Sequence, residues 1–482
     1  MTNVQAANVQ SANVQASNVQ ATHIQTANAQ AAHDQNIQTH KAFADGTDAL
    51  LYLALLAMPV DGTILGFYQP YWTPISPWLF AAYCVCNWRH LRLTARRYAG
   101  FFLLPIALVA LSAPGWAAFG IHRMAVIMSV TGVLGALATL AALDIALDRK
   151  GLDWRAMTGT LIAAYWFAFA TGVLQWLALR LHIETVLRYF IRLMARDYLP
   201  ADSAWGGGRP QFLFAEPSYI GMHLFGILLP LFWLVRQLDR RLASRLRTLI
   251  IVFAAGSILM AAGTRIIVDT VLALVAVIVM EIRWRDASQR RKGVLALIGT
   301  GVFAAACVAA DSRLISILNN GAEGDGSFFM RIWQSLGPLC GLAEHPWTLL
   351  TGYGSGNIVE ATHAGSQRAV NILNAWHMNS SGPAGWYAAQ TSNSMFTMSA
   401  YTNFLTEFGL IGLGLLIALV VRHIVRSGCW HKPAICWLLL VAYLYVQFEG
   451  YAFAALPLLV WGVAKLGPPV PPVRLAITDP LQ

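Results

Sequence analysis

The sequence predicts an all-α, polytopic membrane protein with about twelve transmembrane helices. Of its 482 residues, 57% are hydrophobic and only 12% are charged, and the mean hydropathy is +0.54. Soluble domains are about one-quarter charged, and so few charges cannot cover the polar surfaces that a soluble chain of this length needs. These values exclude a soluble enzyme. The net charge of +10 is interpreted as a topology signal and not as a sign of nucleic-acid binding.

Residues 1–47 are expected to form a cytoplasmic tail. The triplet Asn-Val-Gln recurs every five residues from Asn3 to Asn18 and then decays. A period of five matches neither a helix nor a strand, and the tract has little apolar surface to bury, so disorder is predicted. The tail lacks the basic start and apolar stretch of a signal peptide.

The apolar segments that follow are the expected transmembrane helices. A helix crosses the bilayer in about 20 residues, or fewer where flanking polar groups reach the interface. Nine spans are expected within residues 48–310 and three within residues 400–466, followed by a cytoplasmic tail over residues 467–482. The spans are residues 49–68, 73–87, 99–113, 124–147, 157–179, 217–235, 249–262, 266–282, 293–310, 400–421, 434–447 and 451–466.

The distribution of basic residues predicts the orientation. If the N-terminal tail is cytoplasmic, the segments on its side of the membrane carry 23 of the 33 lysines and arginines, and the opposite segments contain no lysine. Cytoplasmic loops are enriched in Lys and Arg. Both termini are therefore expected in the cytoplasm.

Two segments on the outer side are long, residues 180–216 and 311–399. The second is rich in Gly, Asn, Trp and Tyr, which favours an ordered loop domain over a disordered one. In the first, Arg188, Arg192 and Arg196 are spaced four residues apart. They are expected to share one face of an amphipathic helix that lies on the outer leaflet.

The polar residues favour catalysis over transport. Ion-coupled carriers place ionisable groups within the membrane, whereas the expected spans hold few, mostly near their ends: Asp61, Asp144, His223 and Asp269. No pair of Gly- or Pro-broken helices marks two inverted halves. The informative charges lie at the outer face instead.

Three outer-face arginines form the candidate site. They are Arg209, Arg265 in a turn between two spans, and Arg331 in the long loop. An arginine is always charged and its guanidinium can bind two phosphate oxygens at once. Three converging arginines could hold a pyrophosphate.

Each arginine also has a simpler interpretation. Arg265 precedes Asp269 by four residues, so the two could form an ion pair along one helix. Arg209 could pair with Glu216 or Asp202, and Arg331 could be solvated.

Aromatic residues in the long loop, including Trp333, suit the C–H faces of sugars, although packing at the membrane interface explains such residues equally well. The loop histidines, His345 among them, and the six cysteines lack the spacing of a metal site. No metal or other cofactor is expected.

Several stretches together carry a family resemblance. The first runs from Arg209 to Tyr219 and includes Phe-Ala-Glu-Pro-Ser, and the second is Gly263-Thr-Arg. The third comprises Arg331-Ile-Trp, Glu344-His-Pro, Thr351-Gly-Tyr-Gly-Ser-Gly-Asn and Asn403-Phe-Leu-Thr-Glu-Phe-Gly. Over residues 75–465, their order and topology resemble those of the Wzy-type O-antigen and exopolysaccharide polymerases, which are relatives of the O-antigen ligases.

The resemblance implies a metal-independent membrane glycosyltransferase with a GT-C-like fold and a large periplasmic loop domain. Such an enzyme joins repeat units linked to undecaprenyl pyrophosphate, at the periplasmic face of the bacterial inner membrane. A flippase and a chain-length regulator are the implied protein partners. The ligase relatives carry a His-Asn pair where the chain re-enters the membrane, whereas this chain has Thr402-Asn403. That difference favours a polymerase.

The chemistry and the resemblance together give expected roles. The enzyme must neutralise the leaving pyrophosphate and remove a proton from an acceptor hydroxyl. Glu216 is the first candidate for general base, Glu407 the second and His345 the third, although a carboxylate at a helix start could be only a cap. The expected substrate-binding residues are Arg209, Arg265, Arg331, Tyr219, Trp333, Asn357 and Asn403. The alternatives are a ligase and a non-enzymatic transporter of the same lipid.

Overall fold

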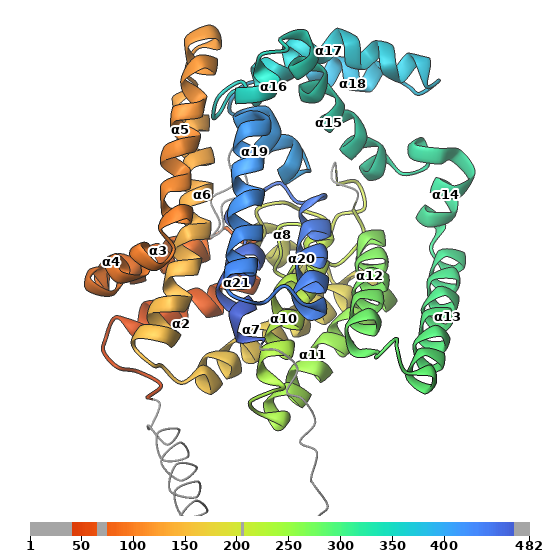
Figure 1. The fold of residues 1–482 in the computed structure, drawn as a ribbon. Helices are drawn as coiled ribbons and strands as arrows, with labels where there is room; N and C mark the ends of the chain where they lie inside the picture. Colours follow the sequence, from red (N-terminus) through yellow and green to blue (C-terminus); the bar gives the residue numbers. More distant parts are fainter. Residues whose placement is uncertain (1–40, 65–74, 204–206, 467–482) are drawn as a thin grey trace, which may run out of the picture.

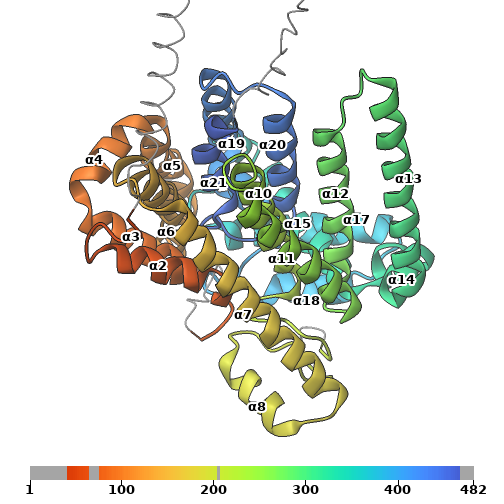
Figure 2. The same cartoon turned by 90° about the horizontal axis from the view of Figure 1, so that it is seen from below.

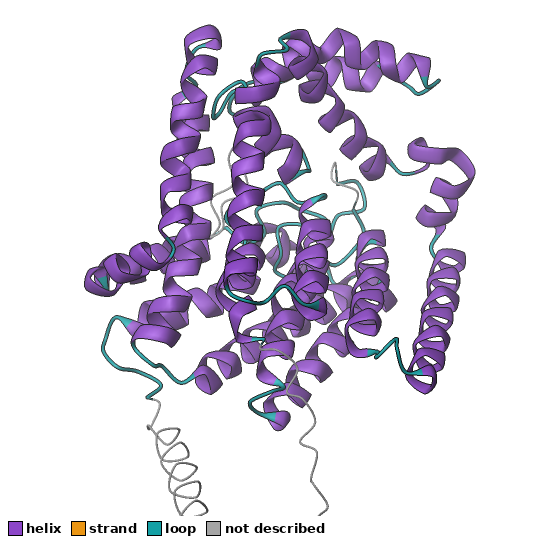
Figure 3. Ribbon diagram, viewed as in Figure 1, coloured by secondary structure: helices purple, strands orange, loops and turns teal. Residues whose placement is uncertain are grey.

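The computed structural model describes residues 41–64, 75–203 and 207–466. Every regular element in these residues is a helix, and the one β-bridge, between Thr63 and Met194, is isolated (Figure 3). Seven described helices are long and apolar enough to cross a membrane. The chain is therefore an all-α membrane protein.

The seven long helices all coincide with expected spans. They are α5 (Ala99–Phe119), α6 (Arg123–Leu143) with its continuation η2 (Asp144–Arg149), α7 (Trp154–Arg180), the broken helix Pro217–Val235, α11 (Arg240–Leu259), α13 (Ala287–Ala310) and α19 (Ala400–Arg426). The broken helix comprises η3 (Pro217–Tyr219), α9 (Ile220–His223), η4 (Leu224–Leu228) and α10 (Leu229–Val235).

The other expected spans coincide with shorter or more charged helices. These are α2 (Asp48–Ala57) with η1 (Met58–Val60), α3 (Ile75–Cys86), α12 (Thr264–Glu281), α20 (Lys432–Tyr445), and α21 (Ala455–Gly462) with η6 (Val463–Lys465). The first expected span, residues 49–68, is helical only to Val60, because Pro59 lies in a short 3-10 turn where the α-helix ends. Residues 65–68 of that span lie outside the described residues, so twelve spans remain a prediction.

Most of residues 311–399 fold into helices at one end of the bundle, the "cap" (Figure 1). Its helices are α14 (Ser312–Asn320), η5 (Gly321–Gly324), α15 (Gly326–Glu344), α16 (Thr348–Thr351), α17 (Ile358–Ala375) and α18 (Ser381–Ala389). Helices α15 and α17 lie very close together: a Cβ on Gly341 would be 2.0 Å from the Ala361 carbonyl oxygen, and one on Gly365 would be 2.1 Å from that of Gly337. Most of these residues are therefore helical and packed together.

A break in α19 ties the cap to the bundle. Gly409 has φ 64°, which interrupts the helix and leaves the carbonyls of Thr406 and Glu407 for other donors. The backbone N–H groups of Tyr353 and Gly354 donate to these carbonyls at 2.8 and 3.0 Å. A glycine fits here because other residues rarely adopt positive φ.

The opposite end of the bundle gathers ion pairs between distant segments. Lys150 pairs with Asp48, and Asp148 pairs with both Arg97 and Lys465. The first described residue lies at this end too, because the Asp153 N–H donates to the Lys41 carbonyl. The two ends of the described chain therefore lie on one side of the bundle, and the cap lies on the other (Figure 1).

The expected surface helix is shorter than its arginine spacing suggested. Helix α8 (Glu184–Leu193) lies at the periphery, beyond α7 (Figure 2), and Arg188 and Arg192 on it are exposed. The third arginine, Arg196, does not belong to this face: the helix has ended, the chain is extended at Met194, and Arg196 is only 3% exposed.

Candidate functional site

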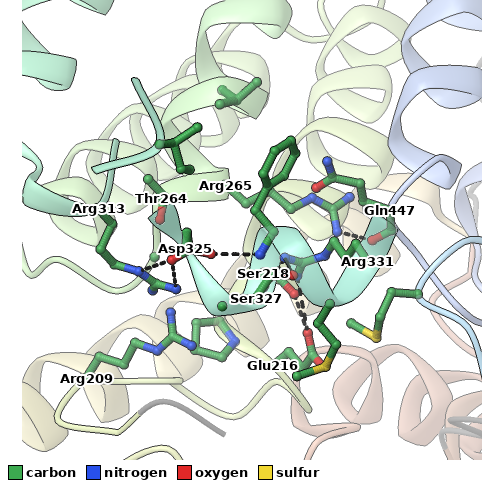
Figure 4. A pocket seen from close by; sticks show the side chains of 18 of the residues that line it. Arg209, Glu216, Ser218, Thr264, Arg265, Arg313, Asp325, Ser327, Arg331 and Gln447 are labelled. Carbon is green, nitrogen blue, oxygen red and sulfur yellow. Dashed lines mark hydrogen bonds and ion pairs between the residues drawn. The ribbon is translucent and has the colours of Figure 1, made fainter. Parts of the chain in front are cut away.

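A cavity of about 690 Å³ lies where the cap meets the bundle. Its wall comes from five regions of the chain: residues 198–203 with 209–218, the start of α12, α14 with the start of α15, residues 396–398, and residues 443–447. Arg209, Arg265 and Arg331, expected from the sequence to converge, all line it. A fourth arginine, Arg313, lines it as well, and we call this space the arginine cavity. In Figure 4, Arg209 and Arg313 lie to one side of the first turn of α15, and Arg265 and Arg331 to the other.

Helix α15 positions Arg331. The helix begins after Asp325, whose carboxylate accepts a hydrogen bond from the Phe328 N–H at 2.8 Å, a typical N-cap. One turn later, Arg331 Nη1 donates to Ser327 Oγ at 2.8 Å, and Arg331 Nη2 lies 4.0 Å from Glu216 Oε2. Burial lowers the pKa of Arg331, although Glu216 opposes the shift. An arginine side chain stays cationic at neutral pH even so, because its ordinary pKa is very high.

Arg265 holds the end of α20 while lining the same cavity. Its Nη2 donates to the Leu444 carbonyl at 3.0 Å, and its Nη1 donates to the Gln447 carbonyl. The ion pair with Asp269 that the sequence suggested is present, with Arg265 Nε 3.4 Å from Asp269 Oδ2. These contacts give Arg265 a clear structural role in addition to its place in the wall.

Arg209 and Arg313 line the wall from different segments. Arg209 lies in the loop before the broken helix, and Arg313 lies on α14. The Arg209 guanidinium lies 5.2 Å from the centre of the Tyr198 ring, a cation–π contact. Burial and the nearby Arg313 charge both lower the pKa of Arg209. Arg313 Nη2 lies 2.5 Å from Asp325 Oδ2, which fixes it beside the N-terminus of α15. Arg313 and Asp325 were not expected from the sequence, although the Asp-Gly-Ser run after a loop resembles a helix start.

Glu216 lies in the cavity wall beneath Arg331. It occupies the N-cap position of the broken helix, but its side chain makes no capping hydrogen bond, so it is not merely a helix cap. Arg196 Nη1 donates to Glu216 Oε1 at 2.6 Å, and Ser218 Oγ donates to Glu216 Oε2 at 2.5 Å. Burial by itself would raise the pKa of Glu216, but Arg196 and then Arg331 outweigh it and hold the pKa below the usual value. Glu216 is therefore ionised at neutral pH.

Arg196 also binds a second acid, which was not expected from the sequence. Its Nη2 donates to Glu449 Oε1 at 3.0 Å, and Glu449 lies in the loop between α20 and α21, 1% exposed. Burial raises the pKa of Glu449, with Arg196 opposing and Glu216 adding to the rise. The two carboxylates around one guanidinium thus have opposite shifts. No local pattern could have signalled this pair, because the partners lie 253 residues apart.

Two of the expected general bases lie away from this cavity. Glu407 is fully buried beside the break in α19, where it accepts hydrogen bonds from Ser129, Tyr451 and the Gly356 N–H at 2.7–2.8 Å. His345 ends α15, and its ring packs against Phe119 with centroids 5.3 Å apart. Both positions join the cap to the bundle, and neither residue lines the cavity.

The expected binding residues other than the three arginines also lie outside the arginine cavity. Asn357 donates to the Gly120 and Tyr353 carbonyls, and Asn403 donates to the Thr397 and Glu449 carbonyls. Tyr219 is fully buried, with its ring 4.8 Å from that of Phe448. None of these three lines the arginine cavity. Trp333 lies on α15 in the wall of a neighbouring cavity.

The charge of the lining defines what the cavity can hold. Among the described residues that line it are four arginines and two carboxylates, Glu216 and Asp325. This balance leaves two positive charges in excess. Such a site favours a compact anion with several oxygens, because guanidinium groups pair well with phosphate. Within the described ranges, no cluster of three or more His, Cys, Asp or Glu side chains is arranged to hold a metal ion.

Comparison with known proteins gives no assignment. No family model and no curated protein matches this chain.

Proposed function

We propose that this protein is a polysaccharide polymerase of the bacterial inner membrane. It would join repeat units carried on undecaprenyl pyrophosphate, with the cap and both long outer segments in the periplasm and the two termini in the cytoplasm. The observation that carries the proposal is the convergence of Arg209, Arg265, Arg313 and Arg331 at one cavity. The sequence resemblance supplies the reaction, and the basic residues at the opposite end of the bundle support the orientation.

The charge excess of the cavity matches the proposed donor. A diphosphate that joins a sugar to a polyprenol carries two negative charges, as many as the positive charges in excess in the wall. When the glycosidic oxygen leaves with the diphosphate, a third negative charge develops. Arginines fixed in advance around that position stabilise it without reorganising, which is how electrostatic catalysis lowers a barrier.

The wall also has an apolar side suited to a lipid chain. Val268 on α12, together with Leu314 and Ile317 on α14, lines the cavity beside the arginines. These helices lie at the edge of the bundle (Figure 2), where a polyprenyl chain could run toward the hydrocarbon region while its diphosphate stays among the guanidinium groups.

The proposed reaction uses Glu216 at the acceptor. The acceptor hydroxyl oxygen attacks the anomeric carbon of the donor sugar, and the bond from that carbon to the diphosphate oxygen breaks. The hydroxyl proton passes to Glu216, and undecaprenyl diphosphate leaves. A carboxylate with a lowered pKa is a weak base, so proton transfer would come late, when the attacking hydroxyl has become acidic.

The decisive test is chain extension by the purified protein. In detergent, with lipid-linked repeat units alone, a polymerase should produce a ladder of longer lipid-linked glycans. A ligase would instead move finished glycan to a separate acceptor, and a transporter would leave the glycans unchanged. In cells, loss of a polymerase leaves single repeat units on the acceptor, whereas loss of a ligase leaves polymer on its carrier.

A further inference from the structure

A second cavity, of about 580 Å³, adjoins the arginine cavity. Met330 and Phe396 line both. Helix α15 contributes to the two walls: Arg331 lines the first cavity, whereas Trp333 and Gln334, two and three residues later, line the second. A molecule held by phosphate in the first cavity could therefore extend past Met330 and Phe396 into the second.

Aromatic rings form much of the second cavity. Phe329, Trp333, Trp386 and Phe396 line it, and the Trp333 and Trp386 rings meet edge to face with centroids 4.9 Å apart. The uncharged polar residues among them are Gln334, Asn379, Gln390 and Ser394. The described lining includes no Asp, Glu, Lys, Arg or His, in contrast to the cavity next to it. Aromatic faces beside amide groups suit a ligand that has both C–H faces and hydroxyl groups.

One buried group points to a missing partner. Gln334 is 1% exposed, and its side-chain oxygen is buried with no hydrogen-bond partner. Buried polar atoms without partners are rare because losing hydration without a replacement bond is costly. Because Gln334 lines the cavity, a turn of its side chain would bring this oxygen to a hydroxyl group of a ligand held there.

We propose that the second cavity binds uncharged sugar units of the lipid-linked glycan. The inference rests on the proposed function for the identity of the glycan, but the binding chemistry rests on this cavity alone. An uncharged sugar fits because the lining offers no ion-pair partner. An aliphatic chain fits less well, because it would leave the Gln334 oxygen without a donor.

The test is direct binding of a free glycan to the full-length protein. The probe is the oligosaccharide released by mild acid from lipid-linked repeat units of the native host, and saturation-transfer NMR in detergent reports its contact with the protein. Trp386→Ala should weaken binding by roughly tenfold, as expected for the loss of a stacking ring. Gln334→Leu, of similar size, should also weaken it. Trp376→Ala is the matched control, because Trp376 is an exposed cap residue, 53% accessible, outside the lining.

Three outcomes decide the inference. Binding that is lost in both cavity variants and kept in the control supports it, provided that circular dichroism and melting temperature show that the variants are folded. No binding to the unaltered protein, or equal binding by all variants, overturns it. Chain extension measured on the same samples separates the two proposals. Sugar binding without extension would refute the polymerase alone. If no free glycan binds, and extension is unaffected by Trp386→Ala and Gln334→Leu, the sugar site alone is refuted.

The same assay can show which glycan occupies the cavity. Binding of the oligosaccharide 1-phosphate should be tighter than that of the free oligosaccharide if the donor lies there, and Arg331→Gln should remove the gain. Equal binding of the two probes would assign the cavity to the acceptor glycan. Either result supports a sugar site.

Discussion

Arg196 and Glu216 form a buried ion pair next to the arginine cavity, whose wall includes Glu216, with Arg196 Nη1 2.6 Å from Glu216 Oε1 and both side chains less than 10% exposed. Because Arg196 also binds Glu449 at 3.0 Å, two carboxylates share one guanidinium. Arg331, 4.0 Å from Glu216 on the cavity side, is the next cation. Glu216 therefore belongs both to the buried ion pair, which stabilises the bundle, and to the charged wall of the proposed site.

Arg196→Gln should therefore destabilise the protein strongly. Breaking a buried pair leaves an uncompensated charge and typically costs about 3–5 kcal/mol, here with two carboxylates left behind. Reversible unfolding in detergent measures the loss. Arg192→Gln is the control, because Arg192 is exposed on α8 and its loss should cost no more than about 0.5 kcal/mol. Equal effects of the two changes would contradict the buried pair.

The same pair predicts a pH dependence of stability. The folded protein holds the pKa of Glu216 below its ordinary value of 4.5, so ionised Glu216 stabilises the fold above pH 4.5, and this contribution is lost as the pH falls through the lowered value. The melting temperatures of wild type and Glu216→Gln should differ at pH 7 and converge on acidification toward pH 3. A difference that stays constant over this range would show that the carboxylate charge does not matter.

Glu216→Gln should also abolish chain extension while leaving the protein inserted. A general base typically contributes about 10²–10⁴-fold to a rate, and the amide cannot accept the proton. The length distribution of lipid-linked glycan reports the effect. Glu344→Gln serves as the control, because Glu344 is a cap residue that does not line the arginine cavity, and its ion pair with Arg368 is exposed. Full-length polymer from Glu216→Gln would remove Glu216 from the mechanism.

Lysine substitutions should separate the roles of two cavity arginines. Arg265 uses its guanidinium to bind the Leu444 and Gln447 carbonyls, so Arg265→Lys should lower the melting temperature. Arg331 makes its hydrogen bonds only to Ser327 on its own helix, so Arg331→Lys should preserve stability but lose the two-oxygen contact with phosphate, reducing the rate by tenfold or more. The reverse pattern would exchange the two assignments.

How far the sequence determines the fold can be seen from individual elements. Hydropathy located the seven described helices that are long and apolar enough to cross a membrane, because a helix in lipid must satisfy its own backbone and so shows a continuous apolar run. It did not give helix ends such as Ala57, although Pro59, in the 3-10 turn that follows, is a local signal for a helix stop. The arginine spacing misled at Arg196, because α8 ends at Leu193 with no Gly or Pro to signal the stop.

The candidate site was predictable only where chemistry showed in a short motif. Arg209, Arg265 and Arg331 could be chosen because each lies in a short motif at the expected outer face, where a guanidinium can bind two phosphate oxygens. Glu449 was missed because its importance comes from burial and from Arg196, 253 residues away. Arg313 was missed for another reason: its partner Asp325 is only 12 residues away, but no motif singled out the pair. Glu407 was chosen for a motif, yet its carboxylate is hydrogen-bonded to residues of α6, the cap and the loop after α20, which no linear pattern reveals.

Glycines in α19 give a further matched test of how the cap is attached. Gly409 has φ 64°, and a Cβ there would lie 2.2 Å from the Leu350 carbonyl oxygen. Gly409→Ala should therefore force the helix straight or displace the cap, which would break the hydrogen bonds that Tyr353 and Gly354 make to α19. The cap should become sensitive to added protease, and chain extension should be lost.

Gly414, five residues later in the same helix, has no atom within 4 Å of a new Cβ. Gly414→Ala should be neutral or stabilise the protein by about 0.5–1 kcal/mol, because alanine favours a helix interior. Similar protease resistance in the two variants would mean that the break at Gly409 does not hold the cap in place.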